Sequence, residues 1–226
     1  MTMRIGLATL VFVGLLTWGG SASAYEVLVD LPQPGRRLGH VAVKVRTFDA
    51  DRWVIYDFGR YGKVWGDLKL QGEGIIRVWR GTRGVRAYLH RRPANPKTVG
   101  YSFRVTEAEE RRIQNYYENL LKTALWSRRN RMYTSYRLPR DYDGVTTQCS
   151  AVALEGLKAV WPRERWKRIL HPRFNRGRGL GPRGRAYFFR MQSRLNLDDV
   201  MLPLDLIAAF REARDLADVG PPRRYR

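Results

Sequence analysis

The hydrophobic period of this chain changes once, near residue 106, and that change limits the folds it can adopt. Before it, short apolar runs alternate with polar residues, and glycine, proline or aspartate separates the runs. In the run 40–46, the valines at 41, 43 and 45 share one face and leave His40 on the other. We predict strands at 25–31, 40–46, 53–58, 75–79, 85–90 and 99–105. Glycine-rich 59–74 is expected to be a loop.

After residue 106 the apolar side chains recur at helical spacing. Thr106 and Glu109 form a capping-box pattern that predicts a helix reaching about Trp126. A polar, tyrosine-rich connection follows. Further helices are predicted from Cys149 to near Trp161, over 163–170 and over 204–216, the last begun by Pro203. Strands first and helices after predict an α+β fold with an antiparallel sheet.

The N-terminus has the pattern of an export signal. Arg4 precedes an apolar run over 5–18, and Ala22-Ser23-Ala24 ends the segment. We therefore expect residues 1–24 to be a secretory signal peptide cut after Ala24, the alternative being an uncleaved anchor. Residues 25–220 would form one domain in the periplasm or outside the cell, without a transmembrane segment. Residues 221–226 are expected to be a frayed basic tail.

Charge limits the partners of such a protein. Lys and Arg number 42 against 21 Asp and Glu, a net charge of +21. A field of this sign attracts polyanions. Export makes nucleic acid an unexpected partner, so the expected partner is an anionic cell wall or membrane. The oligomeric state is left open.

The chain contains a single cysteine, Cys149, which therefore cannot form an internal disulfide. It lies where a polar segment turns into an apolar helical run, and Thr146 or Thr147 is expected to cap that helix. A thiol in the first turn loses its proton more readily there, and the thiolate is a nucleophile. The alternative is a small buried apolar side chain.

A cysteine nucleophile needs an imidazole and a group that orients it. Of the three histidines, His90 ends a predicted strand among arginines, and His171 precedes a proline. His40 begins a strand and has Asp57 on the next predicted strand. His40 and Asp57 are therefore the candidates to complete the site, the alternatives being a structural histidine and a strand-end charge.

Two strand motifs and the cysteine helix resemble a known family. The motifs read Leu38-Gly39-His40-Val41-Ala42-Val43 and Val54-Ile55-Tyr56-Asp57-Phe58-Gly59. With a cysteine opening a later helix, they resemble the circularly permuted NlpC-type branch of the papain-like cysteine hydrolases. That branch includes cell-wall peptidases and amidases, lecithin:retinol acyltransferase-like enzymes and uncharacterised periplasmic proteins.

The resemblance implies a papain-like fold, with the nucleophile at the N-terminus of a helix packed on the sheet. It implies Cys149 as nucleophile, His40 as base and acid, and Asp57 as orienting group. Gln148 stands where many relatives carry asparagine. We expect Gln148 and the Cys149 N–H to contact the oxyanion, with Tyr56 as a further oxyanion or substrate contact.

The Gly/Arg segment 173–185 is a second candidate binding region. Arg178 and Arg183 could clamp phosphate or carboxylate groups of the substrate. The alternative is a flexible, solvated loop. No ligand spacing for a metal emerges, and we expect neither metal nor cofactor.

The sequence favours an exported cysteine hydrolase that cleaves an amide bond, foremost in peptidoglycan peptides, through a thioester. Two alternatives remain open. One is a thioester-forming acyltransferase or lipase acting on membrane lipids or lipoproteins. The other is a non-enzymatic basic protein that binds the cell envelope and whose cysteine is simply buried.

Overall fold

The computed structural model describes residues 25–32, 38–47, 52–66, 69–90, 98–144, 147–169, 182–183, 185–186, 189–190, 202–216 and 218–225. Over these ranges the chain has an α+β fold with an antiparallel sheet, as the sequence predicts. The expected signal peptide lies outside the described residues, and so does Arg178. No helix in the described ranges is long and apolar enough to cross a membrane.

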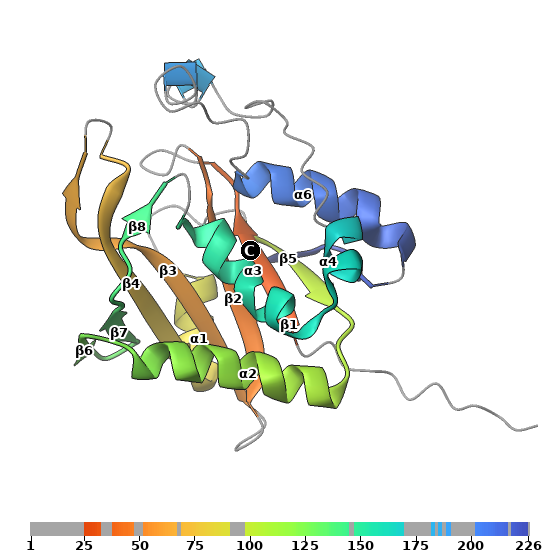
Figure 1. Cartoon of the computed structure of the whole chain (residues 1–226), viewed down its shortest axis with the longest axis horizontal. Helices are drawn as coiled ribbons and strands as arrows, with labels where there is room; N and C mark the ends of the chain where they lie inside the picture. The colour runs from red at the N-terminus through yellow and green to blue at the C-terminus, as the bar shows by residue number, and fades with distance from the viewer. Residues whose placement is uncertain are drawn as a thin grey trace, which may run out of the picture.

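One antiparallel sheet contains the nine strands of the described residues. The strands are β1 (Tyr25–Asp30), β2 (His40–Thr47), β3 (Arg52–Trp65), β4 (Gln71–Arg80), β5 (Thr98–Phe103), β6 (Trp126–Arg129), β7 (Thr134–Arg137), β8 (Tyr142–Asp143) and β9 (Arg223–Tyr225). Their order is β6-β7-β4-β3-β2-β1-β5-β9, and β8 pairs with β4. Because β1 and β2 lie at the middle, they are covered on both faces (Figure 1).

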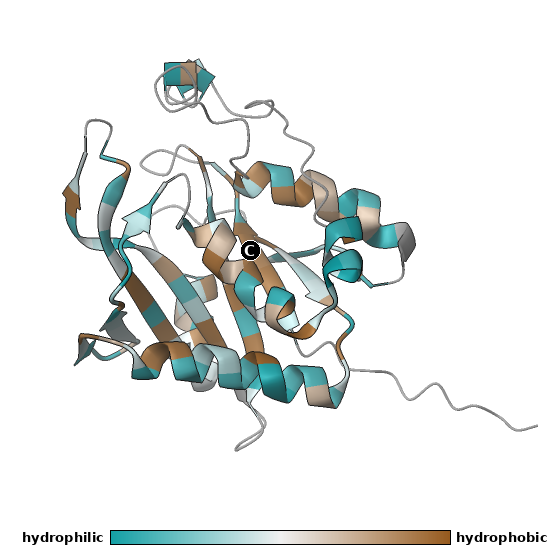
Figure 2. Ribbon diagram, in the orientation of Figure 1, coloured by the Kyte–Doolittle hydropathy of each residue, from teal (hydrophilic) through white to brown (hydrophobic). Residues whose placement is uncertain are grey.

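The helices lie on both faces of this sheet. They are α1 (Gly81–Leu89), α2 (Glu107–Lys122), α3 (Cys149–Val160), α4 (Arg163–Ile169) and α6 (Pro203–Glu212), which continues into the 3₁₀ turn η1 (Ala213–Leu216). The valines of β2 pack in the main core with α2, α3 and α6, whereas Ala42 faces the smaller core that α1 covers. Apolar residues accordingly line both the central strands and the inner helix sides (Figure 2).

The capping box at Thr106 is present as predicted. The Thr106 hydroxyl accepts a hydrogen bond from the Glu109 N–H, and the Glu109 carboxylate accepts one from the Thr106 N–H. The helix that it begins ends at Lys122, before the expected Trp126.

Some sequence-based expectations about local structure were wrong. Residues 85–89 of the strand expected at 85–90 belong to α1, and His90 is its C-cap, because Val85 and Tyr88 at helical spacing cover the second apolar face of the sheet. Most of 59–74 is the hairpin of β3 and β4, because ladder hydrogen bonds do not require apolar alternation. The same holds for β6, β7 and β8 in the tyrosine-rich connection, and for β9 in the expected frayed tail.

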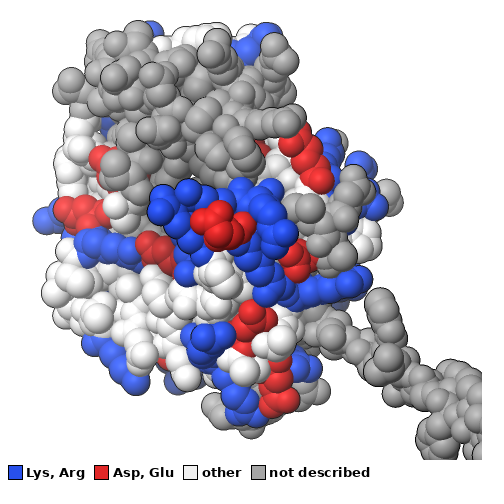
Figure 3. Space-filling view, turned by 45° about the vertical axis from the view of Figure 1, so that its right-hand side comes forward, with Lys and Arg blue, Asp and Glu red and all other residues white. Residues whose placement is uncertain are grey.

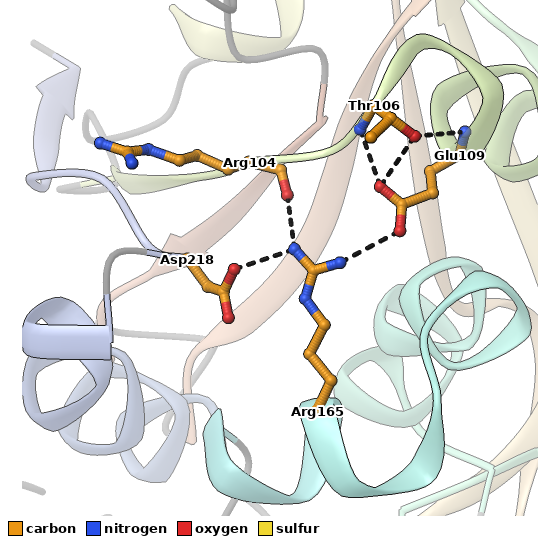
Figure 4. A network of polar contacts seen from close by, with 5 residues as sticks. All are labelled: Arg104, Thr106, Glu109, Arg165 and Asp218. Carbon is orange, nitrogen blue, oxygen red and sulfur yellow. Dashed lines mark hydrogen bonds and ion pairs between the residues drawn. The ribbon is translucent and has the colours of Figure 1, made fainter.

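Arg165 ties α4 to two other parts of the chain (Figure 4). Its guanidinium donates to Glu109 Oε1 at 3.1 Å and to Asp218 Oδ1 at 2.8 Å. It also donates to the Arg104 carbonyl oxygen at 3.1 Å. The Glu109 it binds is the carboxylate of the Thr106 capping box, so α4, the start of α2 and the C-terminal segment share one polar network.

A glycine allows α6 to begin against the strand that carries His40. Gly39 has φ +84°, and a Cβ there would lie 2.6 Å from the Asp30 carbonyl oxygen and 3.2 Å from Pro203 Cβ. Only glycine adopts this left-handed backbone readily in such close contact. The Gly39-His40 pair therefore marks the point where β1, β2 and the start of α6 meet.

Candidate active site

Cys149 is the first residue of α3 and is 4% exposed. Thr147 is not the N-cap residue of α3, and Thr146 lies outside the described residues. Gln148 is the N-cap residue and makes no capping hydrogen bond with its side chain, while the Thr147 backbone exchanges two hydrogen bonds with Asp143. The first turn of α3 holds no acidic side chain. A negative charge on the sulfur is therefore favoured by the helix dipole without competition from a carboxylate in that turn.

His40 and Asp57 meet as the sequence analysis expected. His40 begins β2, and Asp57 lies on the neighbouring antiparallel strand β3. His40 Nε2 lies 2.5 Å from Asp57 Oδ1, and both residues are buried. The imidazole also lies close enough to Cys149 for each group to shift the pKa of the other. Since Asp57 occupies Nε2, Nδ1 is the ring nitrogen left for the sulfur.

The surroundings of Cys149 and His40 favour the charged form of both side chains at neutral pH. Burial alone would raise the pKa of the Cys149 thiol. The positive charge of His40 and the nearby Val41 N–H stabilise the thiolate more than burial destabilises it, so the pKa of the thiol is lowered. Burial would lower the pKa of His40, but Asp57 and the Cys149 thiolate oppose it and raise it to about 9. A thiolate beside an imidazolium is the reactive form of a cysteine nucleophile.

Apolar side chains of the main core pack against Cys149. Cys149 packs with Val41, Val43 and Phe58, and these and their neighbours leave no space for a water molecule. A reacting carbonyl therefore cannot approach the sulfur from the core side. This packing also limits the movement of the sulfur relative to His40.

The structure adds two tyrosines that the sequence analysis did not single out. The Tyr61 hydroxyl donates to Asp57 Oδ1 at 2.7 Å and lies 3.3 Å from His40 Nε2, so it helps to fix the carboxylate. Arg77 stacks on the Tyr61 ring, with its guanidinium carbon 3.6 Å from the ring centroid. The only sequence signal was a tyrosine four residues after Asp57, which in a strand lies on the same face.

Tyr142, on β8, reaches Cys149 itself. Its hydroxyl lies close enough to Cys149 for the sulfur and the backbone N–H of that residue to act on its pKa. Its ring stacks on Phe58 at 5.7 Å between centroids. Burial, and then the charge of the thiolate, raise the pKa of Tyr142 well above its usual value, so the hydroxyl keeps its proton. Nothing in the sequence around Tyr142 distinguished it from the other tyrosines of the same connection.

The remaining predicted site residues are placed differently. Gln148 is buried next to Cys149, where its amide can serve the site. Tyr56 packs beneath Cys149, but its hydroxyl donates to Glu118 of α2 at 2.6 Å, so the expected substrate contact is replaced by a packing role. Arg183 is exposed in a helical segment, and no contact that Cys149, His40 or Asp57 makes within the described ranges involves it.

No group of three or more His, Cys, Asp and Glu side chains among the described residues could hold a metal ion. The candidate site consists of three groups: the Cys149 thiol, whose pKa is lowered, the His40 imidazole, whose pKa is raised, and the Asp57 carboxylate beside that imidazole. Comparison with protein-family models, curated proteins and solved structures finds no match to this chain.

Proposed function

We propose that this protein is an exported cysteine hydrolase of papain-like arrangement that cleaves an amide bond in peptidoglycan peptides. One observation carries the proposal. The Cys149 thiol and the His40 imidazole lie close enough to shift each other's pKa towards an ion pair, and His40 Nε2 is 2.5 Å from Asp57 Oδ1.

In the proposed reaction, the Cys149 thiolate attacks the carbonyl carbon of the amide. The C–N bond breaks as the His40 imidazolium gives its proton to the leaving nitrogen, which leaves a thioester on the sulfur. Neutral His40 then takes a proton from water, whose oxygen attacks the thioester and releases the acid and the thiolate. Asp57 holds the ring in the required tautomer throughout.

The negative oxygen that forms on the carbonyl needs hydrogen-bond donors. The Cys149 N–H is one, and the Tyr142 hydroxyl lies directly beside it. Gln148 directly precedes Cys149 in the sequence. We assign the oxyanion contact to the Cys149 N–H with Tyr142 or Gln148 as the second donor. Removal of a single donor of this kind costs about 100-fold or more in kcat in well-studied hydrolases.

Incubation of the protein with purified sacculi tests the proposal. Release of peptide fragments is expected from the wild type, and Cys149→Ala should abolish it because no other described side chain takes the place of the nucleophile. Asp141→Asn, a change at an exposed carboxylate that pairs with Arg137, is the control and should retain activity. Full release by Cys149→Ala would overturn the mechanism.

A second function keeps the thioester and changes the acyl donor to a lipid. Val64 and Trp65 near the β3–β4 turn are exposed, at 43% and 40%, and Trp126 on β6 is 43% exposed. Exposed tryptophans suit the headgroup region of a membrane. Trp79 and Trp161, by contrast, are buried in the cores. Acyl transfer from phospholipid vesicles, with sacculi left intact, would favour this alternative.

A non-enzymatic envelope-binding protein is the third candidate. It predicts a Cys149 thiol of ordinary pKa that is alkylated slowly in the folded state. The lowered pKa of the Cys149 thiol, to which His40 and the Val41 N–H contribute, argues against an inert apolar role.

A further inference from the structure

Three exposed arginines gather where the C-terminal end of α6 meets the edge of the sheet. Arg211 ends the last turn of α6, Arg214 lies in η1, and Arg224 lies on β9. In the β5–β9 ladder Arg224 pairs with Val99. Because strand side chains alternate, Arg224 shares a face with Val99 and Tyr101, the face that α6 covers.

A buried hydroxyl lies at the centre of these arginines. Tyr101 has no exposed surface, and its hydroxyl makes no well-aligned hydrogen bond. The guanidinium of Arg211 approaches that hydroxyl, and the charges of Arg214 and Arg224 also act on it. A tyrosine hydroxyl is a donor as well as an acceptor. The group therefore places a hydroxyl donor beneath three cations.

None of the three arginines forms an ion pair with a carboxylate of the described residues, whereas the nearby Asp218 is bound to Arg165. Figure 3 shows Lys and Arg side chains gathered in a band across this side of the molecule, with acidic side chains interspersed. Like charges held together raise the free energy of the fold unless an anion neutralises them.

The cluster is connected to the candidate active site through α6. That helix begins with Pro203 against Gly39, the residue before His40, and runs for 10 residues to Glu212. At 1.5 Å per residue, the two ends are about 15 Å apart. A ligand at the arginines therefore leaves Cys149 uncovered, while a polymer bound there can extend to it.

We propose that Arg211, Arg214, Arg224 and the Tyr101 hydroxyl form an anion-binding site that holds closely spaced phosphate or carboxylate groups of an envelope polymer. The inference rests on the proposed function, since the polymer would be the material that the Cys149 site cleaves. A soluble or wall polymer fits better than a lipid surface. None of the exposed large apolar side chains of the described residues lies on α6, η1 or β9.

The test measures binding of two labelled polymers, long-chain polyphosphate and poly-L-glutamate, by fluorescence anisotropy. Full-length protein carrying Cys149→Ser is used, so that binding is read independently of cleavage. One variant replaces Arg211, Arg214 and Arg224 with Gln. The matched control replaces Arg83, Arg86 and Arg128, which are equally exposed on α1 and β6, with Gln. Both triple variants lose the same net charge, and thermal unfolding checks that each is folded.

We expect the first triple variant to bind at least one polymer about tenfold more weakly, and the control less than about threefold more weakly. The slope of log affinity against log salt should fall by about two for the first variant, as ion contacts are lost. Tyr101→Phe should weaken binding of the same polymer about two- to threefold. The polymer that responds identifies phosphate or carboxylate as the ligand group.

Equal losses in both triple variants would overturn the proposal, because binding would then depend on overall charge. It would also be overturned if the first triple variant lost binding to phosphatidylglycerol vesicles but to neither polymer. Wild-type protein that binds a polymer at this site but releases nothing from sacculi would contradict the proposed function and leave the site intact.

Discussion

At the scale of single residues, the neighbours of Cys149 decide its chemistry. Burial by itself makes a thiol inert, and Cys149 is buried. Its sulfur, however, contacts an imidazole, a phenol hydroxyl and a backbone N–H. His40 in turn is held by Asp57, and Asp57 by Tyr61. The acidity of the thiol therefore depends on a chain of contacts that begins on another strand.

Asp57→Asn tests this chain of contacts. Without the carboxylate, burial lowers the pKa of His40, so the imidazolium loses its proton at a lower pH and the thiolate loses its partner. In the wild type, alkylation by iodoacetamide should begin below the ordinary thiol pKa of 9.0. Activity should fall as pH rises through about 9, where His40 loses its proton. In Asp57→Asn the alkylation profile should shift to higher pH.

Asp141→Asn serves as the control, since this partly exposed carboxylate pairs with Arg137. Its alkylation profile should match the wild type. An unchanged profile for Asp57→Asn would show that the Asp57 contact does not set the state of the thiol.

At the scale of secondary-structure elements, α4 shows how a short helix is fixed. It has seven residues and buries only Ile169 completely. Because little apolar surface holds this helix in place, the contacts of Arg165 fix its position. Arg165 donates hydrogen bonds to three partners and stacks on Trp161, whose ring centroid lies 4.0 Å from the guanidinium carbon. Because one of these partners belongs to the capping box of α2, the network also stabilises the start of that helix.

Arg165→Gln should lower the free energy of unfolding by about 1–3 kcal/mol, the usual contribution of partly buried hydrogen bonds to charged groups. Arg165→Lys should recover only part of this loss, because an ammonium cannot form the same fork of bonds. Urea unfolding with an unchanged m-value would measure both. Arg111→Gln, which breaks the exposed Arg111–Glu107 pair, should cost less than about 0.5 kcal/mol. Equal effects at positions 165 and 111 would contradict the assignment.

At the scale of the whole molecule, the C-terminal strand β9 forms one edge of the sheet and brings a tyrosine hydroxyl to the buried carboxylate of Glu26. The Tyr225 hydroxyl donates to the Glu26 carboxylate at 2.8 Å, and Lys44 donates to the same carboxylate at 2.9 Å. Gly100 allows this approach, since a Cβ there would lie 2.0 Å from Glu26 Oε1. Strand β9 thus joins the end of the described chain to its first strand, through partners 199 residues apart.

Tyr225→Phe should lower the free energy of unfolding by about 1–3 kcal/mol, because the buried carboxylate loses a donor. For a chain of this size, that corresponds to a fall in Tm of roughly 2–4 °C per kcal/mol. Deletion of residues 221–226 should cost more, since it also removes the β5–β9 ladder. A deletion variant that melts at the wild-type temperature would show that β9 adds nothing to the stability of the fold.

The strongest sequence signals were those written in local periodicity. The valines of β2, the Thr106 capping box and the helix that begins at Cys149 follow from side-chain spacing over a few residues. Residues 85–90 were misassigned because a window of six residues fits both periods, and the apolar face that α1 covers belongs to strands elsewhere in the chain.

In the candidate site, too, some residues could be predicted from the sequence and others could not. A lone cysteine at a helix start and a histidine at a strand start can be read from the sequence, and Asp57 follows from the pairing of neighbouring strands. Tyr61 could be found only weakly, and Tyr142 not at all, because its position depends on the pairing of β8 with β4. The role predicted for Tyr56 was wrong, because its position beside Asp57 in the sequence does not show that its hydroxyl donates a hydrogen bond to Glu118 on α2.

By itself the sequence determined the α+β class, the antiparallel order of the first strands, the excess of positive charge and three residues that could form a site. Only the tertiary structure decided that the Cys149 thiol lies beside the His40 ring, that two tyrosines lie next to this pair, and that three arginines lie near Tyr101. The physical reason is that spacing along a chain fixes which face a side chain occupies. Which other faces it meets depends on contacts between residues far apart in sequence.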